Sequence, residues 1–275
     1  MIGKLYLIPT PIGNLKEVSP RFYETIEDCS YLACEDTRNT LKLLNILNIS
    51  KKCISCHEHN EKSSSINIIN DILDGETIGY LSDAGYPCIS DPGYILVREA
   101  INKGITIVPI SGPNAMLNAL VGSGLNTDHF FFYGFLSAKS SQRKKELFSL
   151  KTIPFTIIFY ESPHRIKETL KDIYDVFGDR KVSIARELTK LHEEFIRDSL
   201  KNIIEQNQTL IGELVIVIEG AQNTKEEINK DSIINLYNKF LENGFSKKDS
   251  ILATSLSLNI RKNELYDLLK EKNML

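Results

Sequence analysis

The chain has 275 residues, of which 42% are hydrophobic and 25% are charged, a composition that supports a sizeable core and excludes an intrinsically disordered protein. Its 33 Lys and Arg against 36 Asp and Glu give a net charge of −3. Global attraction to nucleic acid is therefore excluded, and any RNA contact would need a local basic patch.

Short apolar runs alternate with amphipathic segments through most of the chain, which indicates an α/β protein with helices on the faces of a largely parallel sheet. The first run, Leu5–Ile8, stops at a Pro-Thr-Pro-Ile-Gly-Asn loop, and Ser19 followed by Pro20 predicts a helix start. We assign residues 1–114 to a first α/β domain. Its further strands are expected at Tyr31–Cys34, around Ile54, at Ile78–Leu81 and at Ile105–Val108.

A second α/β domain is expected over residues 115–223. A helix from about Pro163 to Gly178, with Ser162 as its N-cap, is predicted within it. Its strands are expected at Phe130–Tyr133, Phe155–Tyr160, Val182–Ala185 and Glu213–Ile218. Two such domains in tandem would form a cleft between them.

Residues 224–275 show a helical pattern only. Ser246 predicts the N-cap of a helix that runs toward Leu258. A further helix from Arg261 carries leucines at core spacing, so this tail resembles a helix-turn-helix.

The segment Ser82–Gly93 follows a predicted strand, and the carboxyl ends of strands are where open α/β sheets bind ligands. Gly85 allows a ligand to approach the backbone, and Asp83 and Asp91 can accept hydrogen bonds from hydroxyls or amines. A simple capped turn is the alternative, because Asp and Pro-Gly occur in many loops.

Two other predicted strand ends repeat this loop chemistry, at Pro9–Asn14 and at Ile110–Ala115. Neither they nor Ser82–Gly93 has the glycine spacing of a dinucleotide site or the Gly-Lys-Ser/Thr of a phosphate loop. If the three loops converge, a small ligand with hydroxyls, amines and a ring fits them better than a pyrophosphate.

Several runs together carry a family resemblance. They are Leu5–Leu15, Glu35–Arg38, His57–Glu61, Ser82–Gly93, Gly112-Pro113, Gly134–Leu136, Glu161–Arg165 and Ala185–Lys190. On these runs the chain resembles the tetrapyrrole methylase superfamily, and more narrowly its bacterial members that methylate the 2′-hydroxyl of a cytidine in 16S ribosomal RNA. The Lys247-Lys248 helical tail is also similar.

The resemblance implies two α/β domains with S-adenosylmethionine bound between them, and usually a homodimer. By position it implies a cofactor site formed by Pro11, Asp83, Gly85, Asn114, Ala115 and Tyr160. The strand end at Tyr160-Glu161 and a backbone segment of the second domain are expected to close this site. The chain departs from the usual family pattern at Tyr86, Ser111 and Asn114, where the family commonly has Thr, Pro and Ser.

Methyl transfer from a sulfonium is an in-line displacement, so positioning matters most, and a nearby acceptor would help to remove the proton of a ribose hydroxyl. The predicted catalytic residues are Glu35, Asp36, Glu187 and Lys190, and His57, Glu58 and Glu161 are further candidates. Two alternatives stay open: Asp36 or Thr37 as a helix cap, and a solvent-facing ion pair within Arg186–Lys190.

Basic side chains near these motifs are candidates for RNA phosphate contacts. They are Arg38, Arg143, Lys144, Arg165 and Arg186. A solvated helix face is the alternative for the basic run that contains Arg143 and Lys144.

The run Cys53-Ile-Ser-Cys56-His57 fits a haem-attachment pattern. The residues around it lack the second ligand pair that a zinc site needs, and no metal is expected. The amino-terminal residues lack the features of an export signal, so we expect a cytoplasmic protein with reduced thiols and no membrane partner.

The resemblance thus implies S-adenosylmethionine-dependent 2′-O-methylation of a cytidine in the decoding region of 16S ribosomal RNA, free or in the small ribosomal subunit. Methylation of a tetrapyrrole or another small substrate by the same fold remains an alternative. A noncatalytic RNA-binding assembly factor is the third hypothesis.

Overall fold

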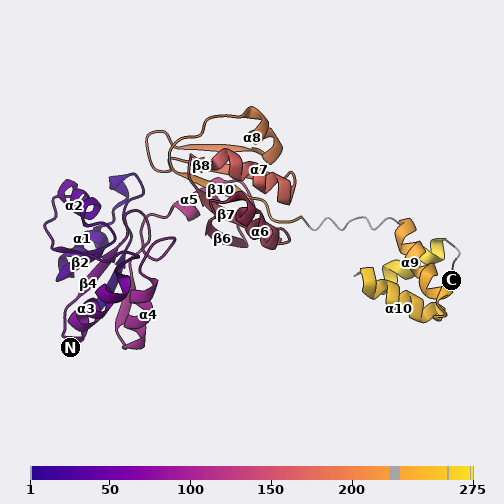
Figure 1. Cartoon of the computed structure of the whole chain (residues 1–275), viewed down its shortest axis with the longest axis horizontal. Coiled ribbons are helices and arrows are strands. Elements are labelled where there is room, and N and C mark those ends of the chain that lie inside the picture. Colours follow the sequence, from indigo (N-terminus) through magenta and orange to yellow (C-terminus); the bar gives the residue numbers. More distant parts are fainter. Residues whose placement is uncertain (1, 223–229, 259, 273, 275) are drawn as a thin grey trace. The chain divides into compact units, whose positions relative to one another are not determined.

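The computed structural model describes residues 2–222, 230–258, 260–272 and 274. The chain divides into two compact units, Met1–Ala221 and Gln222–Leu275. The first unit contains two five-stranded sheets and the second contains helices, so the expected α/β class with a helical tail is confirmed (Figure 1). The predicted boundary between residues 223 and 224 lies outside the described residues.

The first sheet is entirely parallel, in the order β3-β2-β4-β1-β5. Its strands are β1 (Lys4–Ile8), β2 (Tyr31–Cys34), β3 (Cys53–Ser55), β4 (Ile78–Leu81) and β5 (Thr106–Pro109). β2 and β4 are buried along their whole length, which explains their continuous apolar sequence.

Helices cover both faces of this sheet (Figure 1). They are α1 (Pro20–Asp28) and α2 (Thr37–Ile46) on one face, and α3 (Glu61–Leu73) and α4 (Tyr94–Asn102) on the other. The prediction at Ser19 is confirmed, because its side chain accepts the N–H of Phe22 and Pro20 opens α1. Phe22 and Ile26, one helical turn apart, bury the inner face of α1.

The second sheet has the order β6-β7-β10-β8-β9 and is mostly antiparallel. Its strands are β6 (Phe130–Phe135), β7 (Thr156–Glu161), β8 (Lys181–Arg186), β9 (Glu194–Ser199) and β10 (Leu214–Ile218). Only the β6–β7 pair is parallel, so the prediction of a largely parallel arrangement is wrong for this sheet. The edge strand β9 was not predicted.

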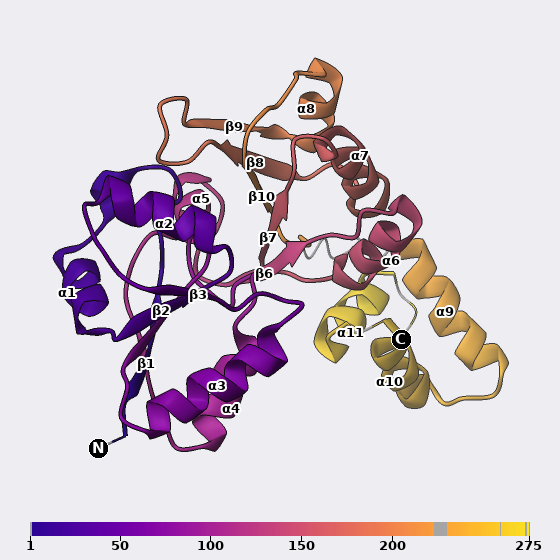
Figure 2. The same ribbon diagram turned by 60° about the vertical axis from the view of Figure 1, so that its left-hand side comes forward.

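Alternate residues of β10 face two different cores, as the period of a strand requires. Leu214 and Ile216 pack beneath α6 (Ser140–Leu150), α7 (Ile166–Phe177) and α8 (Leu200–Gln206). Val215 and Val217 pack beneath α5 (Ala115–Gly122) on the opposite face. Figure 2 shows α5 on the other side of β10 from α7. The second sheet is thus covered on both sides.

The predicted start of α7 is wrong by one turn. Ser162 does not cap the helix, because residues 163–165 form a turn and the N-cap position is Arg165. α7 begins at Ile166 and ends at Phe177, and its C-cap is Gly178, whose φ of +77° suits glycine.

The second unit contains α9 (Lys230–Glu242), α10 (Lys247–Leu258) and α11 (Lys262–Glu271). The predicted cap is confirmed, since Ser246 Oγ accepts the N–H of Asp249 at 3.2 Å. The unit has its own core, formed by Ile233, Tyr237, Leu265, Leu268 and Leu269. Every helix within the described residues is too short or too polar to span a lipid bilayer.

Candidate functional site

A cavity of about 440 Å³ lies in the first unit, within the usual size range of ligand sites. One side consists of loops at the carboxyl ends of the first sheet: Ile12, Glu35, Asp83–Tyr86, Ile89–Asp91, Asn114 and Ala115. The other side comes from the second sheet and its loops: Phe135, Tyr160–Pro163, Leu188 and Gly212–Val215. The cavity therefore joins the two α/β halves.

The three predicted loops meet at this cavity. Thr10 and Gly85 exchange two backbone hydrogen bonds of 2.9 and 3.0 Å, which join the loops after β1 and β4. The Tyr86 hydroxyl accepts the N–H of Gly112 at 2.9 Å and joins the loop after β5. Gly85 has a φ of +75°, a conformation that a side chain would strain.

Three carboxyl groups, from Glu35, Asp83 and Asp91, share the first-sheet side of the cavity. Burial, with the negative charge of Asp83 as a second cause, raises the pKa of Glu35. Burial followed by repulsion from Glu35 and Asp83 raises the pKa of Asp91 to about 7. None of the described lining residues is Lys or Arg, so the cavity favours a cationic ligand.

Asp83 is held in place by the helix after β2. Its Oδ2 accepts a hydrogen bond from Asn39 Nδ2 at 2.7 Å, and its Oδ1 accepts the N–H of Asp36 at 3.3 Å. These two bonds leave further acceptor positions on the carboxylate for a ligand.

The predicted cofactor residues gather at the cavity with one exception. Those that line it are Asp83, Gly85, Asn114, Ala115 and Tyr160. Pro11 does not line it, and the adjacent Ile12 supplies that part of the wall. The Asn114 side chain also accepts the N–H of Leu117 at 2.9 Å, which makes it the N-cap of α5 and fixes its orientation.

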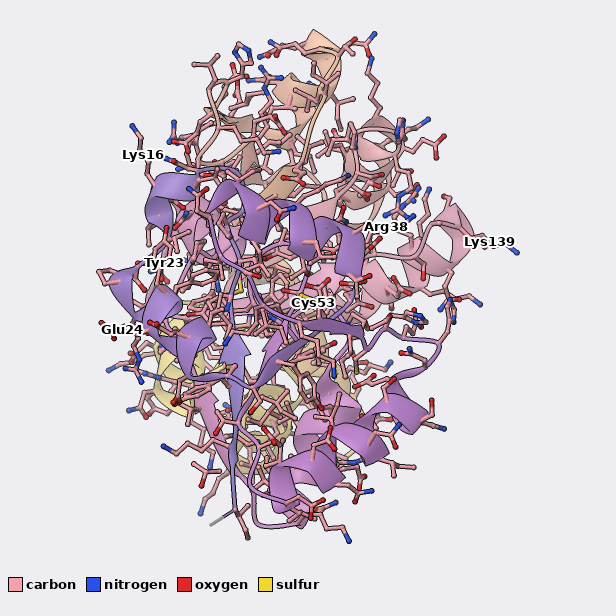
Figure 3. The ribbon with its side chains drawn as sticks, turned by 90° about the vertical axis from the view of Figure 1, so that its left-hand side faces the viewer. Lys16, Tyr23, Glu24, Arg38, Cys53 and Lys139 are labelled. Carbon is pink, nitrogen blue, oxygen red and sulfur yellow. The ribbon has the colours of Figure 1, made fainter. Side chains whose placement is uncertain are left out.

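Of the four predicted catalytic residues, only Glu35 lines the cavity. Asp36 is instead the N-cap of α2, since its Oδ1 accepts the N–H of Arg38 at 2.8 Å. Its Oδ2 pairs with the Arg38 guanidinium at 2.6 Å, and these hydrogen bonds lower the pKa of Asp36 to about 2. The capping alternative therefore describes Asp36. The side chain of Arg38 is 84% exposed. Arg38 lies in the first turn of α2 (Figure 3).

Glu187 and Lys190 form an ion pair beside the cavity, at the turn after β8. Lys190 Nζ contacts Glu187 Oε1 and Glu213 Oε2, both at 2.9 Å. Leu188, within the same turn, reaches the cavity wall. A Cβ atom on Gly13 would come within 2.5 Å of Lys190 Cγ, so the loop after β1 packs directly on this turn.

The predicted RNA-contacting side chains are all engaged with carboxylates. Arg165 pairs with Glu161 at 2.7 Å, and Arg186 pairs with Glu194 at 2.6 Å. Lys144 contacts Asp175 at 2.7 Å. The carboxylate of Glu161 is buried, whereas those of Glu194 and Asp175 are exposed. Exposed pairs are weak, so an RNA phosphate can replace the carboxylate in them.

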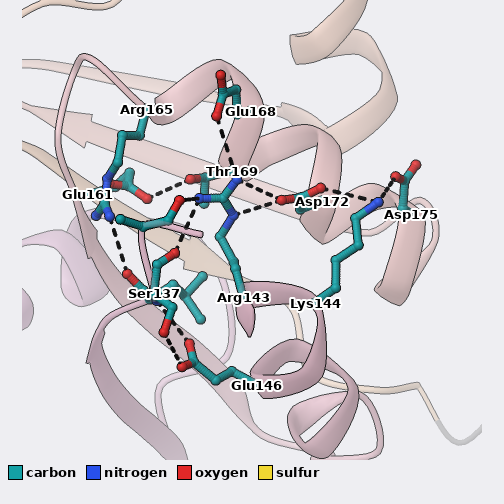
Figure 4. Close-up of polar contacts among 12 residues, drawn as sticks. Ser137, Arg143, Lys144, Glu146, Glu161, Arg165, Glu168, Thr169, Asp172 and Asp175 are labelled. Carbon is teal, nitrogen blue, oxygen red and sulfur yellow. Dashed lines mark hydrogen bonds and ion pairs between the residues drawn. The ribbon is translucent and has the colours of Figure 1, made fainter. Parts of the chain in front are cut away.

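Arg143 is different, because its side chain is completely buried. Its guanidinium binds Asp172 at 2.7 and 2.8 Å, and its Nη1 donates to the carbonyls of Ser137 and Ala138 (Figure 4). The prediction that Arg143 contacts RNA is therefore wrong, since no part of the side chain is accessible. The guanidinium joins α6 to α7.

Sequence reasoning missed Glu61, a buried carboxylate in the first turn of α3. Its Oε1 accepts the N–H groups of Gly93, Ile95 and Leu96 at 3.0, 2.8 and 3.2 Å. Glu61 thus caps α4 from a neighbouring helix and anchors the end of the Ser82–Gly93 loop. The available signal was that the helix after Gly93 has no side-chain cap of its own, so its first N–H groups need an acceptor from elsewhere in the chain.

The sequence indicated a closing backbone segment of the second domain but did not identify it as Gly212–Val215, and it did not indicate Phe135 or Leu188 as part of the wall. The described residues contain no cluster of three or more His, Cys, Asp or Glu arranged to hold a metal ion. All five cysteines are free thiols.

Comparison with known proteins gives consistent matches. The family model for tetrapyrrole (corrin/porphyrin) methylases matches residues 4–204. Ribosomal RNA small subunit methyltransferase I of Halalkalibacterium halodurans is 42% identical over 272 residues, covering 97% of this chain and 94% of that protein. The protein of the same name from Bacillus subtilis is 41% identical over 273 residues, with the same coverage of both chains.

The fold also matches solved structures. Uroporphyrin-III C-methyl transferase from Thermus thermophilus, complexed with S-adenyl homocysteine, superposes with a TM-score of 0.57 at 13% identity. The match covers 79% of this chain and 97% of that one.

Proposed function

The chain belongs to the tetrapyrrole methylase family and is a methyltransferase with S-adenosylmethionine as methyl donor, and on this premise we propose that it methylates the 2′-hydroxyl of a cytidine in 16S ribosomal RNA. The proposed target lies in the decoding region of the small ribosomal subunit. Relatives about 40% identical over nearly the whole chain carry a ribosomal RNA name, which supports this substrate.

The observation that carries the proposal is the carboxylate-lined cavity at the junction of three strand-end loops. S-adenosylmethionine is a cation at its sulfonium and at its ammonium group, and Asp83, Glu35 and Asp91 attract such charges. Asn114, Ala115 and Gly85 offer polar and close backbone contacts, while Tyr160 and Val215 offer apolar surface for a ring.

We assign proton removal from the ribose hydroxyl to Glu35 or Asp91. Both carboxyl groups line the cavity, and a bound sulfonium favours their deprotonated form, in which a carboxylate accepts a proton. Glu187 and Lys190 are assigned to positioning, because their ion pair holds the turn that places Leu188 in the wall.

Arg38, Arg165 and Arg186 are proposed to position RNA by contacts to its phosphates. A cytoplasmic homodimer is part of the same proposal. Sedimentation or light scattering of the purified protein tests the dimer, and a monomer at micromolar concentration would contradict it.

The function is tested by mass spectrometry of ribosomal RNA from a strain that lacks the gene. We expect one 2′-O-methylcytidine to disappear from the 16S RNA and to return with the parent gene but not with an Asp83→Ala version. An unchanged set of ribose methyl groups would refute the RNA substrate. A defect in tetrapyrrole products instead would favour the small-substrate alternative.

A further inference from the structure

Phe135 lies at the end of β6, on the wall of the cavity. We propose that its ring stacks on the pyrimidine base of the target nucleotide and thereby positions the ribose for methyl transfer. The proposal rests on the proposed function, since it concerns how that RNA is held. It makes Phe135 a substrate-positioning residue.

A β-bulge turns Phe135 toward the cavity. In the β6–β7 pairing, Phe132 lies opposite Ile158 but Gly134 lies opposite Phe159, so Tyr133 is an extra residue in the strand. Without the bulge, Phe135 would share the face of Tyr133, which packs against the core beneath α6 and α7. With it, Phe135 shares the face of Phe132 and lies opposite Tyr160.

The bulge itself depends on Gly134. Its φ is +85°, which disfavours any residue with a side chain. A Cβ atom there would also lie 3.2 Å from Ser90 Oγ, so the bulge packs closely on the Ser82–Gly93 loop. The positive φ of Gly134 and its close packing on the Ser82–Gly93 loop therefore fix the direction of the Phe135 ring.

The ring is supported on one side and open on the other. Its centroid lies 5.5 Å from that of Tyr160 in an edge-to-face contact, and Tyr160 in turn contacts Phe132 at 4.9 Å. Phe135 is nevertheless 53% exposed, whereas the next residue, Leu136, is buried. A large exposed aromatic ring on a cavity wall is suited to bind a flat apolar surface.

The backbone after Phe135 is held rigidly by the polar network of Figure 4. The Leu136 carbonyl accepts a hydrogen bond from Arg165 Nη1 at 3.5 Å, and the Ser137 carbonyl accepts one from the buried Arg143 at 3.3 Å. The Ser137 N–H donates to Glu146 Oε2 at 2.9 Å. A platform that is already fixed loses little entropy when it binds a base.

RNA chemistry explains the need for such a platform. A nucleotide whose ribose reacts inside a cavity has to leave its neighbours in the RNA, which removes the stacking of its base. An aromatic ring at the cavity mouth restores that stacking and is the usual partner of an unstacked base. The acidic groups on the opposite side of the cavity remain available to the cofactor.

Steady-state kinetics separate base stacking from a structural role. Methyl transfer to small ribosomal subunits from a strain lacking the gene is measured for Phe135→Leu, Phe135→Tyr and Phe148→Leu. Phe135→Leu keeps an apolar side chain but loses the ring, and we expect kcat/KM to fall by roughly 10- to 100-fold. Phe135→Tyr should keep most activity, and Phe148, 72% exposed on α6 and outside the cavity wall, serves as the matched control.

Affinity for S-adenosylmethionine, measured by calorimetry, should change less than twofold in every variant. Full kcat/KM in Phe135→Leu would overturn the proposal. So would an equal loss of cofactor affinity and of kcat/KM, which would place the ring against the cofactor. If the parent protein methylates no ribosomal RNA, the proposed function fails, and this result is distinct from activity that survives in Phe135→Leu.

Fluorescence provides a direct signature, because the chain contains no tryptophan. Phe135→Trp places a single reporter at the platform, and Phe148→Trp places one outside it. With the cofactor site filled by S-adenosylhomocysteine, cytidine 5′-monophosphate should quench Phe135→Trp but not Phe148→Trp, and ribose 5-phosphate should quench neither. No quenching by the cytidine nucleotide, or equal quenching by the sugar phosphate, would contradict stacking.

Discussion

At the residue scale, the chemistry of the cavity depends on three carboxyl groups that repel one another. The pKa of Asp91 is raised to about 7, because burial and the charges of Glu35 and Asp83 favour its protonated form. A bound cation would reverse this preference. The same group thus connects the pH dependence of stability with the binding of a charged ligand.

Asp91→Asn is expected to reduce the pH dependence of stability of the ligand-free protein between about pH 4 and pH 7. The pKa of Asp91 rises from 3.8 to about 7 on folding. The folded protein therefore holds a proton that the unfolded chain has released in this window, and the free energy of unfolding falls as the pH rises. Urea denaturation at a series of pH values measures the slope.

Asp74→Asn, at an exposed position after α3, is the control for that experiment and should keep the parent slope. Part of the slope should survive in Asp91→Asn, because the pKa of Glu35 is also raised. A slope as steep in Asp91→Asn as in the parent would contradict the assignment.

Asp83→Ala is expected to weaken S-adenosylmethionine binding by roughly 10- to 100-fold, the effect of losing a charge-assisted hydrogen bond of about 1.5–3 kcal/mol. Calorimetric titration measures the affinity. Asn39→Ala is the matched variant, since it removes the hydrogen bond to Asp83 and leaves the carboxylate in place. Equal losses of affinity in both variants would mean that Asp83 matters only through its hydrogen bond to α2 and not through contact with the ligand.

At the scale of elements, the sequence located strands well but not their directions. The apolar runs at Val182–Ala185 and Leu214–Ile218 look the same in a parallel and an antiparallel sheet, so the mixed second sheet could not be predicted. β9 was missed because it has only two apolar residues, Phe195 and Ile196, beside three charged ones, and it follows closely on the turn that carried the predicted motif. The geometry of the connections between strands, rather than the composition of the strands, decides how they pair.

Arg143 illustrates the same limit for helices. A run of basic residues in α6 is typical of a solvated face, and the partner that buries Arg143 lies 29 positions away on α7. Only the packing of α6 on α7 brings Arg143 and Asp172 together. The RNA prediction failed at this residue because the sequence pattern carries no information about that contact.

Arg143→Ala is therefore expected to lower the free energy of unfolding by about 3–5 kcal/mol, because the buried carboxylate of Asp172 would lose its two bonds to the guanidinium and keep only the contact with Lys144 at 3.3 Å. Lys144→Ala removes a side chain that is 42% exposed and contacts both Asp175 and Asp172, and it should cost less, about 1 kcal/mol. Denaturant titration compares the two. If the two variants had similar free energies of unfolding and Arg143→Ala showed a weaker salt dependence of RNA binding, Arg143 would contact RNA after all.

At the scale of the whole molecule, the sequence could predict the convergence of the strand-end loops, because parallel strands end at the same edge of a sheet. It could not predict Gly212–Val215 as the opposite wall, since that segment has no polar motif. The tail builds a core from its own residues, such as Tyr237 and Leu265. We propose that the tail is a separate folding unit.

A fragment of residues 1–222 is accordingly expected to fold without the tail and to bind S-adenosylmethionine within about twofold of the full chain, since the cavity lies entirely in the first unit. Circular dichroism and calorimetry check both statements. A fragment that unfolds, or that loses the cofactor, would show that the first unit depends on the tail.

The most direct test of the account is a crystal structure with S-adenosylhomocysteine. The account predicts its sulfur in the cavity, with Asp83, Asn114 and Ala115 in contact with the ligand and with Glu35 and Asp91 facing the position of the transferred methyl group. A ligand bound elsewhere on the chain, or one in the cavity whose sulfur faces away from these carboxyl groups, would contradict it.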